Sequence, residues 1–416
     1  MDILRIATAG SVDDGKSTLI GRLLYETNSI TKDKIEALES ASKRKGLDFL
    51  DLSLLTDGLI AEREQGITID VAHIYFATPR RKYIIADTPG HFEYTRNMVT
   101  GASNASVSLI LIDARHGVVE QTHRHFYISS MLRIPNVIVC INKMDLVNYE
   151  ESRFDEIVNS FQETASKGSF LGQNVQFIPI SSLFGDNLIK HSEKMNWFKG
   201  ESLLETLENI EVGKVHASHF PARFPVQFVI RPMTDQFHDY RGYSGKISSG
   251  KLMLGDDIMV LPTGQKSKIK SIEKFGNQLN SAIAKESVII TLENDVDISR
   301  GNMLVKINEP AESIKEISAR ICWLDHQNLV SGKMYLLQHG INRVKAKVIR
   351  LDEKINVETL QKSGEASELK LNEIGWIKLK AAQPIFADKF VDNPENGCFI
   401  LIDESSNNTV GIGFIE

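Results

Sequence analysis

The chain has 416 residues, of which 42% are hydrophobic and 25% are charged, so it can form two or three domains with buried cores. Its net charge of −6 argues against a surface built mainly for nucleic acid, and no apolar run approaches the ~20 residues that span a bilayer. Three scattered cysteines, Cys140, Cys322 and Cys398, lack metal-ligand spacing and favour reduced thiols. The chain begins directly with a predicted strand, so we expect no signal peptide, no membrane contact and a cytoplasmic location.

A glycine-rich turn lies between the apolar run 3–9 and a helix-like stretch over 16–24. It follows the pattern G-x-x-x-x-G-K-[ST], and the order strand, loop, helix is typical of a phosphate-binding P-loop. Glycines at both ends allow a tight bend, and the following helix directs the positive end of its dipole at the same anion. Lys16 is expected to reach the β- and γ-phosphates, and Ser17 to bind Mg²⁺ through its hydroxyl. The predicted phosphate-binding residues are Gly10, Ser11, Val12, Asp13, Asp14, Gly15, Lys16, Ser17 and Thr18.

Two segments separate this helix from the next clear motif. The first, 27–55, is polar, and we expect a solvated helical insertion rather than a dedicated anion site. The second places Thr68 between two isoleucines, which by itself indicates only a strand residue. Because it lies after a P-loop and before a strand that ends in Asp-x-x-Gly, we interpret it as a switch segment. Thr68 would then give Mg²⁺ a second protein hydroxyl while a γ-phosphate is present.

The predicted strand 82–86 leads directly into Asp87, the first residue of an Asp-x-x-Gly motif. A carboxylate beside a P-loop suits Mg²⁺ held through a water, so the predicted metal-binding residues are Ser17, Thr68 and Asp87. The N–H of Gly90 can approach the γ-phosphate because no Cβ blocks it.

His91 follows this motif directly. A lone histidine is usually a surface residue or a satisfied core residue, but this position would let it orient the attacking water. We therefore predict that the catalytic residues are His91, Lys16 and Thr68.

Two further buried strands are predicted over 107–112 and 137–141, with a helix over 118–132 between them. The second strand leads into an N-K-x-D sequence that determines the base. The carboxylate of Asp145 can accept hydrogen bonds from guanine N1–H and the 2-amino group, and adenine offers neither donor. The lost hydrogen bonds would give discrimination on the order of 10⁴. Asn142 is expected to brace the loop, and the stem of Lys143 to cover one face of the base.

The last strand of this half is predicted over 176–180, and the backbone N–H groups of Ser181, Ser182 and Leu183 could reach guanine O6. Every motif thus lies beyond the carboxyl end of a predicted parallel strand, where doubly wound sheets bind ligands. The alternation of strands and helices independently predicts such a sheet. We expect an α/β P-loop GTPase domain with a doubly wound, mainly parallel sheet over 1–212, binding GTP and Mg²⁺.

The pattern changes near 213–225, after which helices nearly vanish and short strands alternate with turns. This predicts two all-β barrel domains, over 222–310 and 313–416, with a break at Asn308-Glu309-Pro310. This half contains no clustered carboxylates, no His/Cys site and no nucleophile motif. We therefore expect a binding platform for a partner rather than a second active site.

The whole motif set resembles the translation-factor class of GTPases, in which a G domain precedes two barrels. Within that class, the P-loop is similar to that of the large, GTP-binding subunit of bacterial sulfate adenylyltransferase. The key position is Asp14, where elongation factors typically have His. The barrel segments 241–245 and 371–375 match the same branch. Two departures are Ser182, where Ala is usual, and His123, where Arg is usual.

This resemblance implies a GTPase subunit of a heteromeric ATP sulfurylase, acting in sulfate assimilation as a heterodimer or higher oligomer. A smaller catalytic subunit would join ATP and sulfate into adenosine 5′-phosphosulfate and diphosphate. This chain would couple GTP hydrolysis to that uphill reaction through a switch whose two states bind the partner differently. Some relatives carry a C-terminal adenylylsulfate kinase, which we do not expect here.

The alternative is an elongation factor-like GTPase that delivers aminoacyl-tRNA. The net negative charge, Asp14 and the barrel motifs favour the adenylyltransferase subunit, so no nucleic-acid partner is expected.

Overall fold

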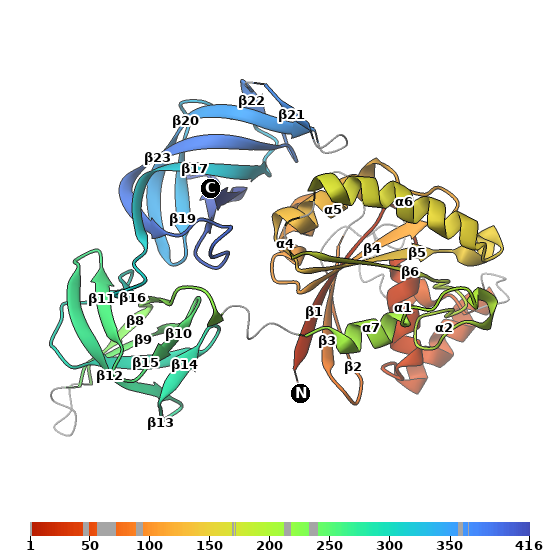
Figure 1. Ribbon diagram of the computed structural model, residues 1–416, viewed down its shortest axis with the longest axis horizontal. Helices are drawn as coiled ribbons and strands as arrows, with labels where there is room; N and C mark the ends of the chain where they lie inside the picture. Colours follow the sequence, from red (N-terminus) through yellow and green to blue (C-terminus); the bar gives the residue numbers. More distant parts are fainter. Residues whose placement is uncertain are drawn as a thin grey trace. The chain divides into compact units, whose positions relative to one another are not determined.

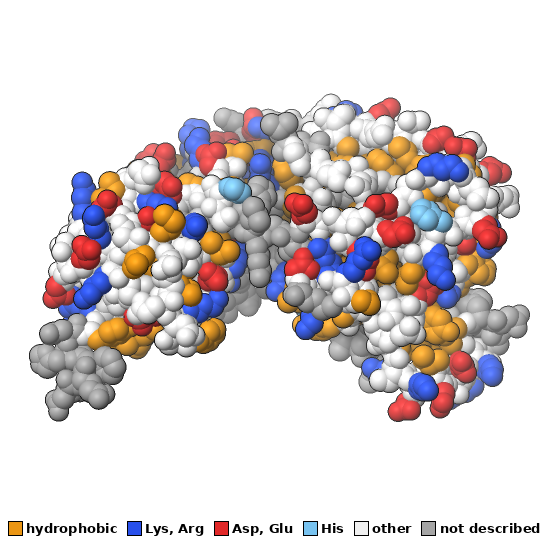
Figure 2. Space-filling view, turned by 60° about the horizontal axis from the view of Figure 1, so that its bottom comes forward, with side chains coloured by type: hydrophobic (Ala, Val, Ile, Leu, Met, Phe, Trp, Pro, Cys, Tyr) orange, Lys and Arg blue, Asp and Glu red, His pale blue; other side chains and the backbone are white. Residues whose placement is uncertain are grey.

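The computed structural model describes residues 2–44, 50–55, 72–88, 95–168, 170, 172–211, 218–232, 240–356, 361–364 and 366–416. The chain forms two compact units, one of residues 1–212 with 356–361 and the other of residues 213–355 with 362–416. The first contains the α/β sheet, and the second contains two sets of β-strands (Figure 1). Within the described residues, no helix combines the length and apolar character needed to cross a bilayer. Side chains of both charge signs are interspersed on the face shown in Figure 2, as the modest net charge suggests.

The first unit is built on a six-stranded sheet of order β2-β3-β1-β4-β5-β6. Only β2 runs antiparallel to its neighbour, which confirms the doubly wound, mainly parallel sheet. β4 is buried at every residue, as expected for a parallel strand covered by helices on both faces. The strands are β1 (Ile3–Ala9), β2 (Ala72–Ala77), β3 (Lys82–Asp87), β4 (Val107–Asp113), β5 (Asn136–Asn142) and β6 (Asn174–Pro179).

Helices cover both faces of this sheet, with α5 and α6 on one side and α1 and α7 on the other (Figure 1). On α1, Leu19, Ile20 and Leu23 are fully buried against the sheet because they share one helical face. The polar insertion contains α2, as predicted. The helices are α1 (Lys16–Glu26), α2 (Lys32–Arg44), α4 (Thr95–Ala102), α5 (Glu120–Met131), α6 (Glu151–Gly168) and α7 (Leu203–Asn209), with short 3₁₀ turns η1 (Leu52–Leu55), η3 (Met144–Val147) and η4 (Glu193–Met195).

The second unit contains the two predicted all-β domains. In the first, an eight-stranded sheet has the order β7-β16-β11-β12-β15-β9-β8, with β13 beside β12, and β10 pairs with β14. Its strands are β7 (Arg223–Pro225), β8 (Phe228–Ile230), β9 (Gly242–Lys246), β10 (Lys251–Met253), β11 (Asp257–Leu261), β12 (Gln265–Lys274), β13 (Asn277–Leu279), β14 (Ser281–Ile283), β15 (Ser287–Leu292) and β16 (Met303–Lys306).

In the second β domain, the sheet order is β19-β24-β25-β17-β23-β20-β21, and β19 also pairs with β20, which closes six strands into a barrel. β18 and β22 form a separate pair. The strands are β17 (Glu312–Trp323), β18 (Leu329–Val330), β19 (Met334–His339), β20 (Asn342–Asn356), β21 (Gln361–Ser363), β22 (Glu368–Leu369), β23 (Ile374–Ala387), β24 (Cys398–Ile402) and β25 (Thr409–Ile415).

The sequence predicts a strand over the apolar run 226–230, but only its last three residues form one, β8, and the separate short strand β7 lies directly before this run. β7 ends at Pro225 and pairs with β16, whereas β8 begins at Phe228 and pairs with β9. The two residues between them still bond to the sheet, since Val226 N–H donates to Asn302 O and Gln227 N–H donates to Ser244 O. The chain therefore crosses here between the two ends of the eight-stranded order. An apolar run alone cannot reveal such a change of partner.

The two β domains are joined by a buried ion pair. Arg223 is 1% exposed, and its guanidinium donates two hydrogen bonds to Asp388, from Nε to Oδ2 at 2.9 Å and from Nη2 to Oδ1 at 2.7 Å. Its Nη1 donates to the backbone oxygens of Ala222 and Glu309. The amides of Asn393 and Asn396 also donate to Asp388. A charge this deeply buried is tolerated because it is both paired and hydrogen-bonded.

Candidate nucleotide-binding site

The parallel register brings the predicted motifs to one edge of the first sheet. Thr8 near the end of β1 lies opposite Asp87 at the end of β3, and Asp113 at the end of β4 lies opposite Asn142 at the end of β5. The P-loop follows β1 directly and leads into α1. The structure thus places side chains that are far apart in sequence around the carboxyl ends of four neighbouring strands.

The P-loop backbone depends on its two glycines. Gly10 has φ 155° and Gly15 has φ 93°, values that other residues rarely adopt. A Cβ on Gly15 would lie 2.5 Å from Nδ2 of Asn142. Glycine is required at this position both for the turn and for the close approach of Asn142.

Lys16 is 7% exposed and is the first residue of α1. Its ammonium donates to Gly10 O at 2.7 Å and to Ser11 O at 2.9 Å, so it lies across the mouth of the loop. Burial lowers the pKa of Lys16, and the carboxylates of Asp87 and Asp14 oppose that shift. A cation held among the loop's own backbone groups is suited to binding phosphate oxygens.

Asp14 is also buried, and its side chain is directed into the loop. Its Oδ2 accepts a hydrogen bond from Ser11 N–H at 2.5 Å. Burial raises the pKa of Asp14, while the charge of Lys16 acts to lower it. The N–H of Ser11 therefore already has a partner, and Asp14 fixes the conformation of the loop.

Asp87 is held by the strand beside it. It is 2% exposed, and its Oδ1 accepts a hydrogen bond from Thr8 Oγ1 at 2.8 Å. In return, the hydroxyl of Thr88 donates to Thr8 O. These contacts fix the carboxylate next to the end of β1, from which the P-loop starts, and Ser17 lies half-buried on α1. Three other predicted site residues, Thr68, Gly90 and His91, lie outside the described residues.

Asn142 connects the phosphate-binding loop to the loop after β6. Its Nδ2 donates to Asp14 O at 2.7 Å, and its Oδ1 accepts from Ser182 N–H at 2.9 Å. Lys143 has a left-handed backbone, φ 63°, and its ammonium bonds to Asp13 O and to Asp113 at 2.9 Å. The N-K-x-D segment is thus attached to the P-loop at two points.

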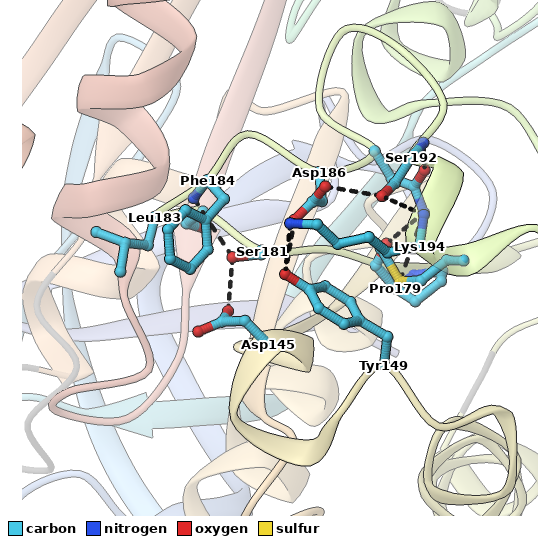
Figure 3. A network of polar contacts seen from close by, with 12 residues as sticks. Asp145, Tyr149, Pro179, Ser181, Leu183, Phe184, Asp186, Ser192 and Lys194 are labelled. Carbon is cyan, nitrogen blue, oxygen red and sulfur yellow. Dashed lines mark hydrogen bonds and ion pairs between the residues drawn. The ribbon is translucent and has the colours of Figure 1, made fainter. Parts of the chain in front are cut away.

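The Asp145 carboxylate is positioned by the same neighbouring loop, since Ser181 Oγ donates to its Oδ1 at 2.6 Å (Figure 3). We predicted that the backbone N–H groups of Ser181, Ser182 and Leu183 could reach guanine O6, but two of them already have partners. Ser181 N–H donates to Asp186 O, and Ser182 N–H donates to Asn142, as described above. Of the three N–H groups, only that of Leu183 lacks a hydrogen-bond partner among the described residues.

Two family models match this chain. A model described as "Elongation factor Tu GTP binding domain" matches residues 1–212, and one described as "GTP-eEF1A C-terminal domain-like" matches residues 316–416. The chain is 45% identical to "Sulfate adenylyltransferase subunit 1" of Psychromonas ingrahamii, over 100% of this chain and 87% of that protein. The protein of the same name from Tolumonas auensis is 46% identical, over 99% of this chain and 86% of that protein.

The chain belongs to the sulfate adenylyltransferase subunit 1 family. It is also 44% identical to "Bifunctional enzyme CysN/CysC" of Mycobacterium tuberculosis, over 99% of this chain and 67% of that protein. Among solved structures, it is similar to sup35 complexed with GMPPNP, with a TM-score of 0.44 and 22% identity over 100% of this chain and 93% of that chain. That likeness is too distant to bear on function. The P-loop GTPase domain of this chain, residues 1–212, binds a guanine nucleotide.

Two residues of this family member's site were not predicted from the sequence. Asp113 is 2% exposed and accepts hydrogen bonds from the side chains of Arg115 and Lys143. Burial acts to raise the pKa of Asp113, but these hydrogen bonds hold it well below its usual range. On the other side of the site, Arg22 of α1 donates to Leu183 O. Asp113 had a sequence signal, as a carboxylate at the end of a mostly apolar run, whereas Arg22 had none.

Proposed function

We propose that this chain is the GTP-hydrolysing subunit of a heteromeric sulfate adenylyltransferase. It couples GTP hydrolysis to the formation of adenosine 5′-phosphosulfate and diphosphate from ATP and sulfate. The partner is the smaller catalytic subunit, since relatives at 45% identity carry the name "subunit 1". We assign residues 1–212 to the GTPase domain and residues 222–310 and 313–416 to the two barrels, which serve as the platform for that partner.

One observation carries the GTPase assignment. The amide of Asn142 bonds to the P-loop at Asp14 O and to the base-side loop at Ser182 N–H. This bridge supports a single site in which the ammonium of Lys16 would bind phosphate and the carboxylate of Asp145 would read the base. If the P-loop sequence were a chance match, we would not expect its backbone to be hydrogen-bonded by the asparagine of an N-K-x-D segment.

Each residue has a defined role in this proposal. Lys16 and the P-loop backbone bind the phosphates, and Asp145 accepts from guanine N1–H and the 2-amino group. The donor set fits Mg²⁺, because Ser17, Asp87 and Thr68 offer the oxygen ligands that this ion prefers, and the bound ion neutralises phosphate charge. Gly90 N–H meets the γ-phosphate and His91 orients the attacking water.

Replacement of Asp145 by Asn tests the base assignment. The carboxamide can donate to the 2-oxo group of xanthine, so affinity should shift from GTP toward XTP. Asp155→Asn, an exposed change on α6, is the matched control and should leave GTP preferred. Unchanged selectivity in Asp145→Asn would remove this residue from base recognition.

The coupling is tested with the partner subunit. The purified complex should form adenosine 5′-phosphosulfate from ATP and sulfate faster with GTP than without it, and His91→Ala should abolish the stimulation while sparing GTP binding. Hydrolysis stimulated by ribosomes, with no sulfate-dependent effect, would instead favour the elongation factor-like alternative.

A further inference from the structure

A polar cluster lies beside Asp145 and Ser181, in the two loops that would read the base (Figure 3). It is formed by Tyr149, from the turn that follows η3, and by Asp186, Ser192 and Lys194, from the segment that follows β6. We refer to these four residues as the Lys194 cluster. None of them belongs to the GTPase sequence motifs.

The cluster is connected by short contacts. Tyr149 Oη donates to Asp186 Oδ2 at 3.0 Å, and the other oxygen of Asp186 accepts from Ser192 Oγ at 2.7 Å. The ammonium of Lys194 donates to Tyr149 Oη at 3.0 Å and forms an ion pair with Asp186 at 3.4 Å. The hydroxyl of Tyr149 thus links the loop that contains the N-K-x-D segment to the loop that follows β6.

The ammonium of Lys194 also lies over two aromatic rings, 4.9 Å from the centre of Tyr149 and 5.1 Å from that of Phe184. Phe184 is the residue after Leu183, and its N–H donates to Ser181 Oγ. Because that hydroxyl donates to Asp145, the cluster reaches the base-reading carboxylate through two intermediate residues, Phe184 and Ser181.

The backbone at Tyr149 is in an uncommon conformation. Asn148 and Tyr149 have φ values of 54° and 58°, and a bulky residue is rarely found in the left-handed region. The turn is held in place because Trp197 Nε1 donates to Tyr149 O at 2.9 Å. Unfavourable backbone geometry at this point directs the phenol into the cluster, and such geometry concentrates near ligand sites.

Stability alone does not account for Lys194. Its side chain is 51% exposed, and ion pairs with so exposed a partner contribute little to folding. What the ammonium does is to hold Tyr149, Phe184 and Asp186 together. These residues come from the two loops that must keep a fixed separation for a base to fit between them.

We propose that Lys194, Tyr149 and Asp186 are positioning residues for guanine recognition. They hold Asp145 and the Ser181–Leu183 backbone at the separation that lets one base bond to both. This inference rests on the proposed function, because it concerns the same guanine site, and it adds a specificity determinant outside the sequence motifs.

The test compares two nucleotides that differ by one group. IDP lacks the 2-amino group of GDP, so the ratio of GDP to IDP affinity measures how well Asp145 is placed. Tyr149→Phe removes only the hydroxyl, and Lys194→Met removes the ammonium and keeps most of the apolar stem. Each should speed dissociation of a fluorescent GDP by about two- to fivefold and lower the GDP-to-IDP affinity ratio by a similar factor. Lys194→Arg, which keeps a cation, should restore most of the ratio.

Lys190→Met is the matched control, as an exposed lysine in the same loop, and should behave as wild type. If Tyr149→Phe and Lys194→Met weaken GDP and IDP equally, or leave both unchanged, the cluster is only structural and the proposal is wrong. Failure of the wild-type protein to prefer GDP over IDP would instead refute the guanine site itself. Melting temperatures identify any variant that fails to fold, and the remaining variant then decides.

Discussion

Replacing Asp388 by alanine should destabilise the two-barrel unit by about 3–5 kcal/mol, because it leaves a buried guanidinium without its anion. Arg223 is 1% exposed and donates two hydrogen bonds to this carboxylate. The amides of Asn393 and Asn396 lose a bond as well, but each retains a second acceptor, Ser249 Oγ and Phe386 O respectively. Most of the expected loss therefore comes from the unpaired charge.

An exposed ion pair between the same two β domains provides a matched control. Lys285 and Glu395 form an ion pair between them, but their side chains are 46% and 35% exposed. Glu395→Ala should therefore cost only about 0–1 kcal/mol. The double replacement Arg223→Met with Asp388→Leu should cost much less than the sum of the single changes, because no buried charge is left unpaired.

Urea unfolding followed by tryptophan fluorescence measures these differences. The chain has three tryptophans, and Trp323 and Trp376 lie in β17 and β23 of the second unit. A Trp197→Phe background therefore limits the signal to that unit. If Asp388→Ala loses no more stability than Glu395→Ala, the buried pair does not hold the two β domains together and the reasoning fails.

Three further predictions concern the first unit. Burial lowers the pKa of His125 to about 3 in the folded protein, while the unfolded chain takes up a proton near pH 6.5. Stability should thus be complete above pH 6.5 and fall by up to about 1.4 kcal/mol per pH unit toward pH 3, and His125→Gln should flatten that slope in Trp197-monitored unfolding. Gly15→Ala should weaken GDP binding by more than about tenfold because its Cβ meets Asn142, whereas Gly172→Ala, with a similar φ and open surroundings, should bind GDP normally. Ser182→Ala should raise the free energy of unfolding by about 1 kcal/mol, because its buried hydroxyl has no partner among the described residues; a lower melting temperature would contradict this.

The fold was largely predictable because its signals are local. The run 107–112, apolar except for Ser108 and ending in Asp113, predicted a doubly covered strand, and β4 is buried throughout. The turn residues after residue 225 predicted two all-β domains, and two are present, although β17, β20 and β23 are longer than the short strands expected, with 12, 15 and 14 residues. These patterns depend on neighbours within a few residues, so composition and periodicity are sufficient to detect them.

Contacts between residues far apart in the sequence were not predictable in the same way. Arg223 and Asp388 are 165 positions apart, and neither lies in a motif. Lys194 occupies a polar stretch that reads as an ordinary surface loop, and its importance appears only when Tyr149 and Asp186 come together in space. The predicted role of the Ser182 N–H likewise overlooked Asn142, which competes for that donor.

The bridge made by Asn142 has a consequence for which ligands the site accepts. A single rigid amide spans the carbonyl of Asp14 and the N–H of Ser182, so the two ends of the site cannot move apart independently. In the proposed site, a guanosine nucleotide would act as a chelate: once one end is bound, the other would already be at the correct distance, and its binding would require little further ordering. A molecule whose base and phosphates are spaced differently can satisfy only one end. In the proposed site, Asn142 would therefore select for the spacing between base and phosphates, while Asp145 would select the base.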